Sequence, residues 1–155
     1  IAASLASKQC ARAPRASAEE RLVEGATSPP RILCLDTDRN LADALGSEVG
    51  RCVVVHYADS KAALERADLE PFDLLLFDCE AGGFQALEGL RGRPRYRHTP
   101  IVMLTAVGDD EQVEKAFVLG ADEFLAKPFE IGGLVAHAAG LLERERALAR
   151  VRNAL

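Results

Sequence analysis

The stretch FDLLLFD, residues 72–78, decides the fold of this 155-residue chain. Its apolar run, residues 72–77, is almost continuous, whereas a strand with one face in water alternates apolar and polar residues. Such continuity is typical of a strand that is covered on both faces. Four more short apolar runs occur along the chain, at residues 32–35, 52–56, 101–105 and 123–126. The five runs together predict a parallel sheet that lies between two layers of helices.

The segments between these runs have the spacing of amphipathic helices, as Leu41 and Leu45 illustrate. Asp59 and Asp109 stand where two of the helices are expected to begin, because an aspartate side chain caps the first backbone N–H groups of a helix. Gly120 is expected to follow the end of the fourth helix. Right-handed crossovers place helices on both faces of the sheet. The predicted fold class is α/β, a doubly wound five-stranded parallel sheet built from five strand–helix units, (βα)5.

The two ends of the chain differ from this core in composition. Residues 1–30 are rich in Ala, Ser, Arg and Pro and carry no wide apolar stripe, so we expect a flexible linker or N-terminal tail. Because the chain opens with Ile1 and not with Met, we expect it to be a piece of a longer protein.

The last helix is expected to begin near Ile131 and to continue to the end of the chain. Leucines recur in it every seven residues, whereas the companion positions of a coiled-coil heptad are mostly polar. These leucines are Leu134, Leu141, Leu148 and Leu155. Two interpretations stay open. The segment is either one amphipathic helix that covers the sheet, or a signalling helix that pairs with a second copy or leads into an output domain.

The composition is that of a globular protein, with 48% hydrophobic and 28% charged residues. A net charge of −5 argues against direct binding of nucleic acid through a broad basic surface. The longest apolar stretch, residues 101–107, is far shorter than the roughly 20 residues that span a membrane. The four cysteines, at positions 10, 34, 52 and 79, contain no CxxC pair. We therefore expect reduced thiols, with Cys34 and Cys52 buried, no metal site with His56, and a cytoplasmic protein.

Four arginines stand close together at positions 91, 93, 95 and 97. Such a cluster could dock an acidic partner or nucleic acid. Tyr96 is the one aromatic residue among them, and no second basic segment supports such a surface. A solvated loop is therefore the simpler interpretation.

Polar and charged side chains stand at the ends of the predicted strands. Asp36 and Asp38 follow the first strand, Asp78 follows the third, Thr105 ends the fourth and Lys127 follows the fifth. Each alone is explained as a cap or turn residue, but the carboxyl ends of parallel strands share one edge of the sheet, where ligands bind in such folds. Carboxylates held together there need a cation such as Mg²⁺. With a hydroxyl and an ammonium group beside them, they suit phosphoryl transfer.

Four segments that carry these residues resemble the signature segments of the bacterial response-regulator receiver domain, in order and in spacing. They are RILCLDTD (31–38), FDLLLFDCEAGGFQALEGLR (72–91), TPIVMLTA (99–106) and GADEFLAKPF (120–129). The resemblance covers about residues 31–143 and implies a CheY-like, flavodoxin-like fold with strand order 2-1-3-4-5. Residues 144–155 would then extend the last helix, as a coiled coil or as a link to an output domain.

The resemblance also implies a role for each site residue. Asp78 would be the phosphoacceptor, and Thr105 and Lys127 would contact the phosphoryl group. Asp36, Asp78 and the backbone carbonyl of Glu80 would bind Mg²⁺. Phe124 would be the aromatic side chain whose conformation is linked to activation; the alternative interpretation is that Phe124 is simply a core residue. The implied protein is a cytoplasmic signalling domain and not an enzyme. Its implied partners are a sensor histidine kinase or phosphotransfer protein, a second copy bound through the last helices, and an output domain.

Three positions depart from the family pattern. Thr37 stands where the family usually has a second acid, so we expect weak Mg²⁺ binding unless Asp38 takes its place. Gly82 and Ala86 stand where the family commonly has proline and glycine, which changes the loop after Asp78. The alternative function is therefore a degenerate receiver, a protein-interaction or dimerisation module that works without phosphate.

Two other classes of protein fit parts of the sequence. The LDTD segment also suits a phosphatase of the haloacid-dehalogenase type, but such a site needs aspartates after the lysine, and the last aspartate here is Asp122. A flavodoxin-like cofactor protein would carry a Gly-rich phosphate loop after its first strand, and none is present.

Overall fold

The computed structural model describes residues 29–48 and 52–155. Residues 1–28 of the predicted tail lie outside the described residues, so the tail stays a prediction. The five strands are β1 (Arg31–Leu35), β2 (Val53–Tyr57), β3 (Leu74–Asp78), β4 (Ile101–Thr105) and β5 (Glu123–Ala126). The five α-helices are α3 (Asn40–Glu48), α4 (Ser60–Leu69), α5 (Gly83–Arg91), α6 (Asp110–Val118) and α7 (Ile131–Ala154). Two short 3₁₀ helices, η1 (Cys79–Ala81) and η2 (Pro94–Tyr96), flank α5.

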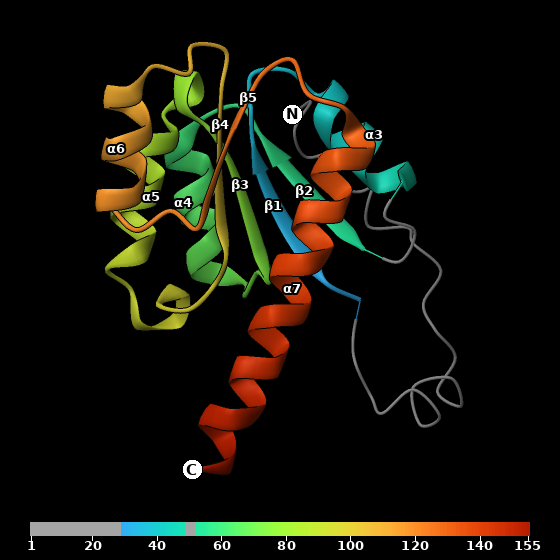
Figure 1. Ribbon diagram of the computed structural model, residues 1–155, viewed down its shortest axis with the longest axis vertical. Coiled ribbons are helices and arrows are strands. Elements are labelled where there is room, and N and C mark those ends of the chain that lie inside the picture. Colours follow the sequence, from blue (N-terminus) through green and yellow to red (C-terminus); the bar gives the residue numbers. More distant parts are fainter. Residues whose placement is uncertain (1–28, 49–51) are drawn as a thin grey trace.

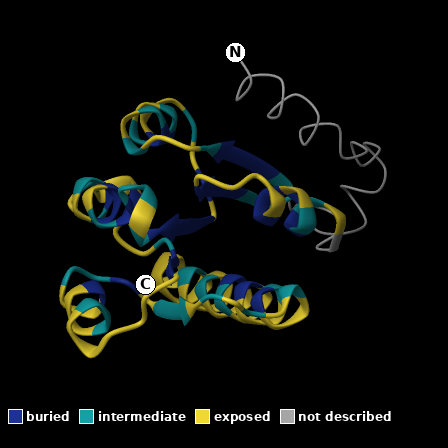
Figure 2. Ribbon diagram, turned by 90° about the horizontal axis from the view of Figure 1, so that it is seen from above, coloured by how far each residue is buried: buried dark blue, intermediate teal, exposed yellow. Residues whose placement is uncertain are grey.

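All neighbouring strands are parallel, and their order is β2-β1-β3-β4-β5, which confirms the predicted fold. Helices α4, α5 and α6 lie on one side of the sheet and α3 and α7 on the other (Figure 1). Seen from above, the buried strands form the middle layer between helices whose outer faces are exposed (Figure 2).

The central strand β3 shows why the sheet is covered twice. Leu75 and Phe77 belong to the cluster beneath α4, α5 and α6, whereas Leu74 and Leu76 belong to the cluster beneath α3 and α7. All four side chains are fully buried. Because successive side chains of a strand point to opposite faces, a continuous apolar run supplies both cores at once.

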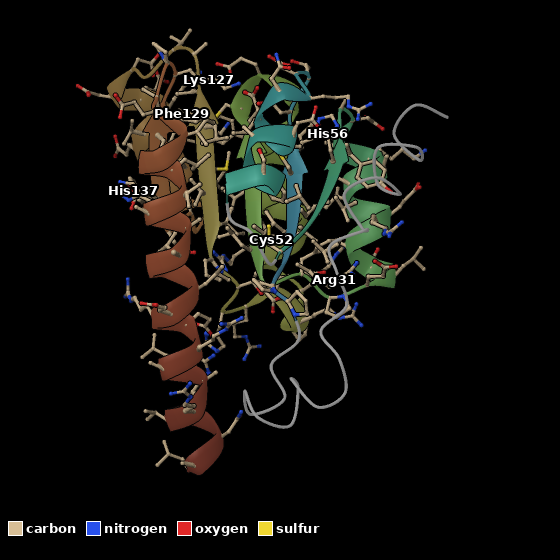
Figure 3. The ribbon with its side chains drawn as sticks, turned by 90° about the vertical axis from the view of Figure 1, so that its right-hand side faces the viewer. Arg31, Cys52, His56, Lys127, Phe129 and His137 are labelled. Atoms are coloured by element: carbon tan, nitrogen blue, oxygen red, sulfur yellow. The ribbon has the colours of Figure 1, made fainter. Side chains whose placement is uncertain are left out.

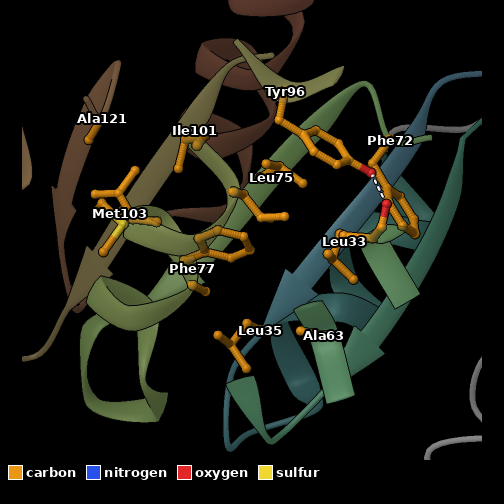
Figure 4. Packing of buried hydrophobic residues seen from close by; sticks show 14 of the residues in the cluster. Leu33, Leu35, Ala63, Phe72, Leu75, Phe77, Tyr96, Ile101, Met103 and Ala121 are labelled. Atoms are coloured by element: carbon orange, nitrogen blue, oxygen red, sulfur yellow. Dashed lines mark hydrogen bonds between the residues drawn. The ribbon is translucent and has the colours of Figure 1, made fainter. Parts of the chain in front are cut away.

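The larger of these two clusters is anchored by Tyr96, which Figure 4 shows beside Phe72 and Leu75. The Tyr96 ring is buried, and its hydroxyl donates to the backbone carbonyls of Ala67 at 2.6 Å and Glu70 at 2.8 Å. A buried hydroxyl needs such partners. Tyr96 therefore fastens the η2 loop to the end of α4.

The helix boundaries agree with the sequence signals. The side chains of Asp59 and Asp109 accept hydrogen bonds from the backbone N–H groups of Ala62 and Gln112, which confirms both as N-caps. Gly120 follows α6 with a φ of 107°, a left-handed conformation that favours glycine.

The prediction of a solvated arginine loop is wrong for Arg91. Its guanidinium donates to the carbonyls of Gly120 at 2.6 Å and of Tyr96 and Thr99 at 2.9 Å, and it pairs with Asp122 at 2.8 Å. The positive charge of Arg91 is thus paired within the domain. Arg93, a second member of the cluster, also forms an ion pair, with Asp68 of α4.

Helix α7, with 24 residues, extends beyond the sheet that it covers (Figure 1). Its first half packs on the sheet through Leu134, Ala138 and Leu142, which are buried. Its second half projects beyond the sheet (Figure 1), and the side chains of Leu148 and Val151 are 45% and 60% exposed. In the part of the chain that the structure describes, no helix combines the length and the apolar character needed to cross a membrane.

Candidate functional site

The carboxyl ends of the strands bring the predicted site residues together. Asp36 comes directly after β1, Asp78 and Thr105 end β3 and β4, and Lys127 comes directly after β5. Figure 3 shows Lys127 and His56 at this end of the sheet and Arg31 at the opposite end. The backbone N–H of Lys127 donates to the carbonyl of Thr105 at 2.6 Å, which ties the end of β5 to that of β4.

Asp36 and Asp78 share a single cation. The ammonium Nζ of Lys127 donates to Asp36 Oδ2 at 2.9 Å and to Asp78 Oδ2 at 3.0 Å. The two aspartates are only 1% and 2% exposed, whereas Lys127 is half-buried. Two buried carboxylates beside each other require a positive charge. Lys127 supplies it.

The backbone around Asp36 is fixed by the neighbouring strand. His56 of β2 donates from Nε2 to the carbonyl oxygen of Asp36 at 2.7 Å, and the N–H of Asp36 donates to the carbonyl of Tyr57. His56 is therefore a hydrogen-bonded core residue, and Cys34 and Cys52 are buried as predicted.

Protonation in the site is strongly perturbed. The pKa of Asp78 is raised to about 6, first by burial and then by a hydrogen bond with the Glu80 side chain, while Lys127 opposes the rise. The hydrogen bond with Asp78 lowers the pKa of Glu80 to about 2. Burial alone would lower the pKa of Lys127, but its hydrogen bonds to Asp36 and Asp78 raise it above the usual value. As the pH falls, the Asp78 carboxylate therefore binds a proton at a higher pH than the exposed Glu80 carboxylate does.

Thr105 is fully buried, and its hydroxyl faces Glu80. Thr105 Oγ1 donates to Glu80 Oε1 at 2.7 Å, the shortest of three acceptor contacts, the others being the Val107 carbonyl and Gln112 Oε1. The backbone N–H of Ala106 donates to the same Glu80 oxygen at 3.1 Å. The sequence implies a role only for the backbone carbonyl of Glu80 and carries no signal for this contact of its side chain.

Asp38 does not join the two buried carboxylates. Its Oδ1 accepts the backbone N–H of Asn40 at 2.9 Å and its Oδ2 the Asn40 side-chain amide at 3.3 Å, so the carboxylate caps the start of α3. Within residues 29–48 and 52–155, no three or more His, Cys, Asp and Glu side chains are grouped to hold a metal ion. Thr37 is exposed.

The loop after Asp78 takes a form that its glycines permit. Gly82 has a φ of 84°, which proline cannot adopt. A Cβ atom on Gly83 would lie 2.5 Å from the carbonyl oxygen of Asp78, so α5 starts closer to β3 than any other residue would allow. Phe124 on β5 is half-buried and packs against the cluster beneath α4, α5 and α6.

The fold and this site define the class of protein. The chain matches the model of the response regulator receiver domain over residues 32–139, and it belongs to this family. Receiver domains are signalling domains and are generally not enzymes. The structure is similar to the chemotaxis response regulator CheY4 of Vibrio cholerae, with a TM-score of 0.66 and 26% identity over 72% of this chain and 98% of that one.

Two curated proteins illustrate the relationship in sequence. The chain is 34% identical over 119 residues to the transcriptional activator protein PfeR of Pseudomonas aeruginosa, which is 76% of this chain and 39% of that protein. It is also 34% identical over 118 residues to the transcriptional regulatory protein CpxR of Escherichia coli K12, which is 74% of this chain and 50% of that protein. The chain thus spans half or less of these relatives.

Proposed function

We propose that this domain accepts a phosphoryl group on Asp78 from the phosphohistidine of a sensor histidine kinase or phosphotransfer protein. The observation that carries the proposal is the Lys127 ammonium shared by the buried carboxylates of Asp36 and Asp78. In the transfer, an Asp78 oxygen forms a bond to phosphorus while the phosphorus–nitrogen bond of the donor breaks, and the bonding pair leaves with the imidazole. Lys127 and the Thr105 hydroxyl then contact the oxygens of the bound group.

The donor chemistry of the site fits a magnesium ion. Asp36 and Asp78 offer hard carboxylate oxygens, which Mg²⁺ prefers, and one ammonium group balances only part of their charge. Asp36, Asp78 and the backbone carbonyl of Glu80 would hold the ion. When bound, it supplies positive charge beside the phosphoryl oxygens.

The direct test is incubation of the purified domain with acetyl phosphate and Mg²⁺, followed by intact mass measurement. We expect a gain of one phosphoryl mass in the unaltered domain and none in Asp78→Asn, because the amide lacks the nucleophilic oxygen. The absence of any gain at high Mg²⁺ concentration would contradict the proposal.

Magnesium binding is proposed to be weak, because Thr37 stands next to Asp36 without a charge. Thr37→Asp is expected to raise the Mg²⁺ affinity by at least about tenfold, since an added carboxylate near a divalent ion contributes several kcal/mol even in a screened environment. Titration of backbone amide signals with MgCl₂ measures the change. Thr99→Asp, which adds the same charge before β4 at the opposite end of the sheet, is the control and should leave the affinity unaltered. Equal affinities for Thr37→Asp and the unaltered domain would contradict the role given to Thr37.

The output of the domain is proposed to run through protein contacts in the cytoplasm. Repacking around Thr105 and Phe124 would change the partner of the face formed by α6, β5 and α7. PfeR and CpxR are named as transcriptional proteins, and both are longer than this chain, which favours an output domain that acts on transcription.

A second candidate function is a degenerate receiver that works without phosphate. It is favoured by the projecting half of α7, where Leu148 and Val151 are exposed and suit pairing with a second copy of the chain. The acetyl phosphate experiment separates the two functions, because a domain that gains no phosphoryl mass must signal through contacts such as these.

A further inference from the structure

The side chain of Glu80 occupies a small anion site at the end of β4. One carboxylate oxygen, Oε1, accepts both the Thr105 hydroxyl at 2.7 Å and the Ala106 backbone N–H at 3.1 Å. Two donors that converge on one negatively charged oxygen form the arrangement that stabilises oxyanions in proteins. The donors belong to β4 and to the residue after it, whereas Glu80 comes from η1 beyond β3.

The same two donors face the oxygen atoms that would arrive on Asp78. Glu80 is two residues from Asp78, and its backbone N–H donates to Asp78 Oδ1 at 3.0 Å, so both carboxylates share one corner of the site. Thr105 is fully buried, which limits its hydroxyl to acceptors within the site. A phosphoryl group carries up to two negative charges and three acceptor oxygens. It therefore requires the donors that Glu80 holds and is repelled by the charge of Glu80.

The surroundings give the Glu80 side chain a place to move. Glu80 is exposed and borders a cavity of about 510 Å³ that Glu111, Gln112 and Lys115 also line. The ammonium of Lys115 lies 4.5 Å from the ring centroid of Phe84, at the edge of this cavity. A rotated Glu80 would find the positive charge of Lys115 there, alongside the carboxylates of Asp109 and Glu111.

We propose that the Glu80 carboxylate is a built-in occupant of the phosphoryl-binding donors, which the incoming phosphoryl group must displace. The inference rests on the proposed function, because it assigns the Thr105 hydroxyl and the Ala106 N–H to the phosphoryl oxygens. While Asp78 is unmodified, Glu80 occupies these two hydrogen-bond donors. A higher concentration of the phosphoryl donor is then needed to phosphorylate Asp78. It acts through Thr105 and Ala106, so it is a positioning residue.

The test compares the rate of phosphorylation by acetyl phosphate, at saturating Mg²⁺, in the unaltered domain, Glu80→Ala, Glu80→Gln and Glu111→Gln. We expect Glu80→Ala to react about tenfold faster, the factor that one charge-assisted hydrogen bond typically corresponds to. Glu80→Gln is expected to react only a few times faster, since its amide oxygen still accepts both donors but carries no charge. Glu111→Gln removes one carboxylate from the same cavity without touching Thr105, and its rate should match that of the unaltered domain.

Amide hydrogen exchange at Ala106, one of the two hydrogen-bond donors, gives a second measurement. The Ala106 amide proton should exchange with solvent faster in Glu80→Ala than in Glu111→Gln, because Glu80 is its hydrogen-bond acceptor. Equal phosphorylation rates in all variants, or a slower rate in Glu80→Ala, would overturn the inference and leave the proposed function intact. An equal gain in Glu80→Ala and Glu111→Gln would also overturn it, since net charge alone would explain the effect. No phosphorylation of any variant would overturn the proposed function and the inference together.

Discussion

In EDTA at pH 8, the Asp78→Asn variant is expected to be more stable than the unaltered domain by about 2–3 kcal/mol. Burial raises the pKa of Asp78 from its ordinary value of 3.8 to about 6. Each unit of pKa difference between the folded and unfolded states corresponds to about 1.4 kcal/mol. Above pH 6 the folded domain must hold a buried charge that the unfolded chain exposes to water, and asparagine removes this cost.

The sign of the pH dependence follows from the same shift. The folded state holds the Asp78 proton more tightly than the unfolded state does, so its contribution to stability is complete below about pH 4 and is lost as the pH rises to about 6. Asp78→Asn lacks this loss. The two proteins should therefore have similar free energies of unfolding near pH 4 and diverge as the pH rises. Urea denaturation followed by circular dichroism, at intervals between pH 4 and pH 8, measures the difference.

Asp43→Asn is the matched control, because it removes the same formal charge from an exposed position on α3. Its stability should track that of the unaltered domain within about 0.5 kcal/mol over the whole range. A stability difference between Asp78→Asn and the unaltered domain that stays constant with pH would contradict the assigned cause.

The second large effect is expected at the opposite end of the sheet. Arg91→Ala should lower the free energy of unfolding by about 3–4 kcal/mol, because it leaves several partly buried carbonyl groups without this donor and Asp122 without its ion pair. The Arg91 side chain is only 18% exposed. It joins the end of α5 to the loop before β4 and, through Gly120 and Asp122, to the turn before β5.

Arg93→Ala tests whether the position or the charge matters. Arg93 belongs to the same arginine cluster, but its pair with Asp68 lies at the surface, where such pairs contribute about 1 kcal/mol or less. Thermal unfolding of both variants at one pH and salt concentration compares them. Equal losses would show that Arg91 has no special role in joining these segments.

Short-range patterns were enough to predict the five parallel strands, whereas their order was implied by the resemblance to receiver domains. Strand β4 begins and ends where its apolar run does, because a buried parallel strand is apolar on both faces. The edge strand β5 also matches its run, although it is only partly buried. Strand β3 begins at Leu74, two residues after the start of its apolar run at Phe72. The carboxylate of Asp73, just before the strand, accepts the backbone N–H of Arg31 at the start of β1. That contact joins distant residues, and no local pattern reports it.

The candidate site divides in the same way. Asp36, Asp78, Thr105 and Lys127 could be predicted because parallel strands bring their carboxyl ends to one edge. The side chain of Glu80 could not, since its bond to Thr105 spans 25 positions and depends on the direction of one side chain. Arg91 escaped prediction for a related reason. A run of arginines looks the same in sequence whether the charges meet water or backbone carbonyls.

The length of α7 turns a small displacement into a larger one. The helix begins four residues after Lys127, and its 24 residues correspond to roughly 36 Å. Its packed half ends near Leu142, so the part beyond it is a lever arm of roughly 18 Å with its pivot on the sheet. A tilt of about 10° at that pivot would swing the tip by about 3 Å, a helix being stiff over this length. A motion that starts beside Lys127 and tilts α7 would thus displace the far end of the helix by a larger distance than it displaces the start.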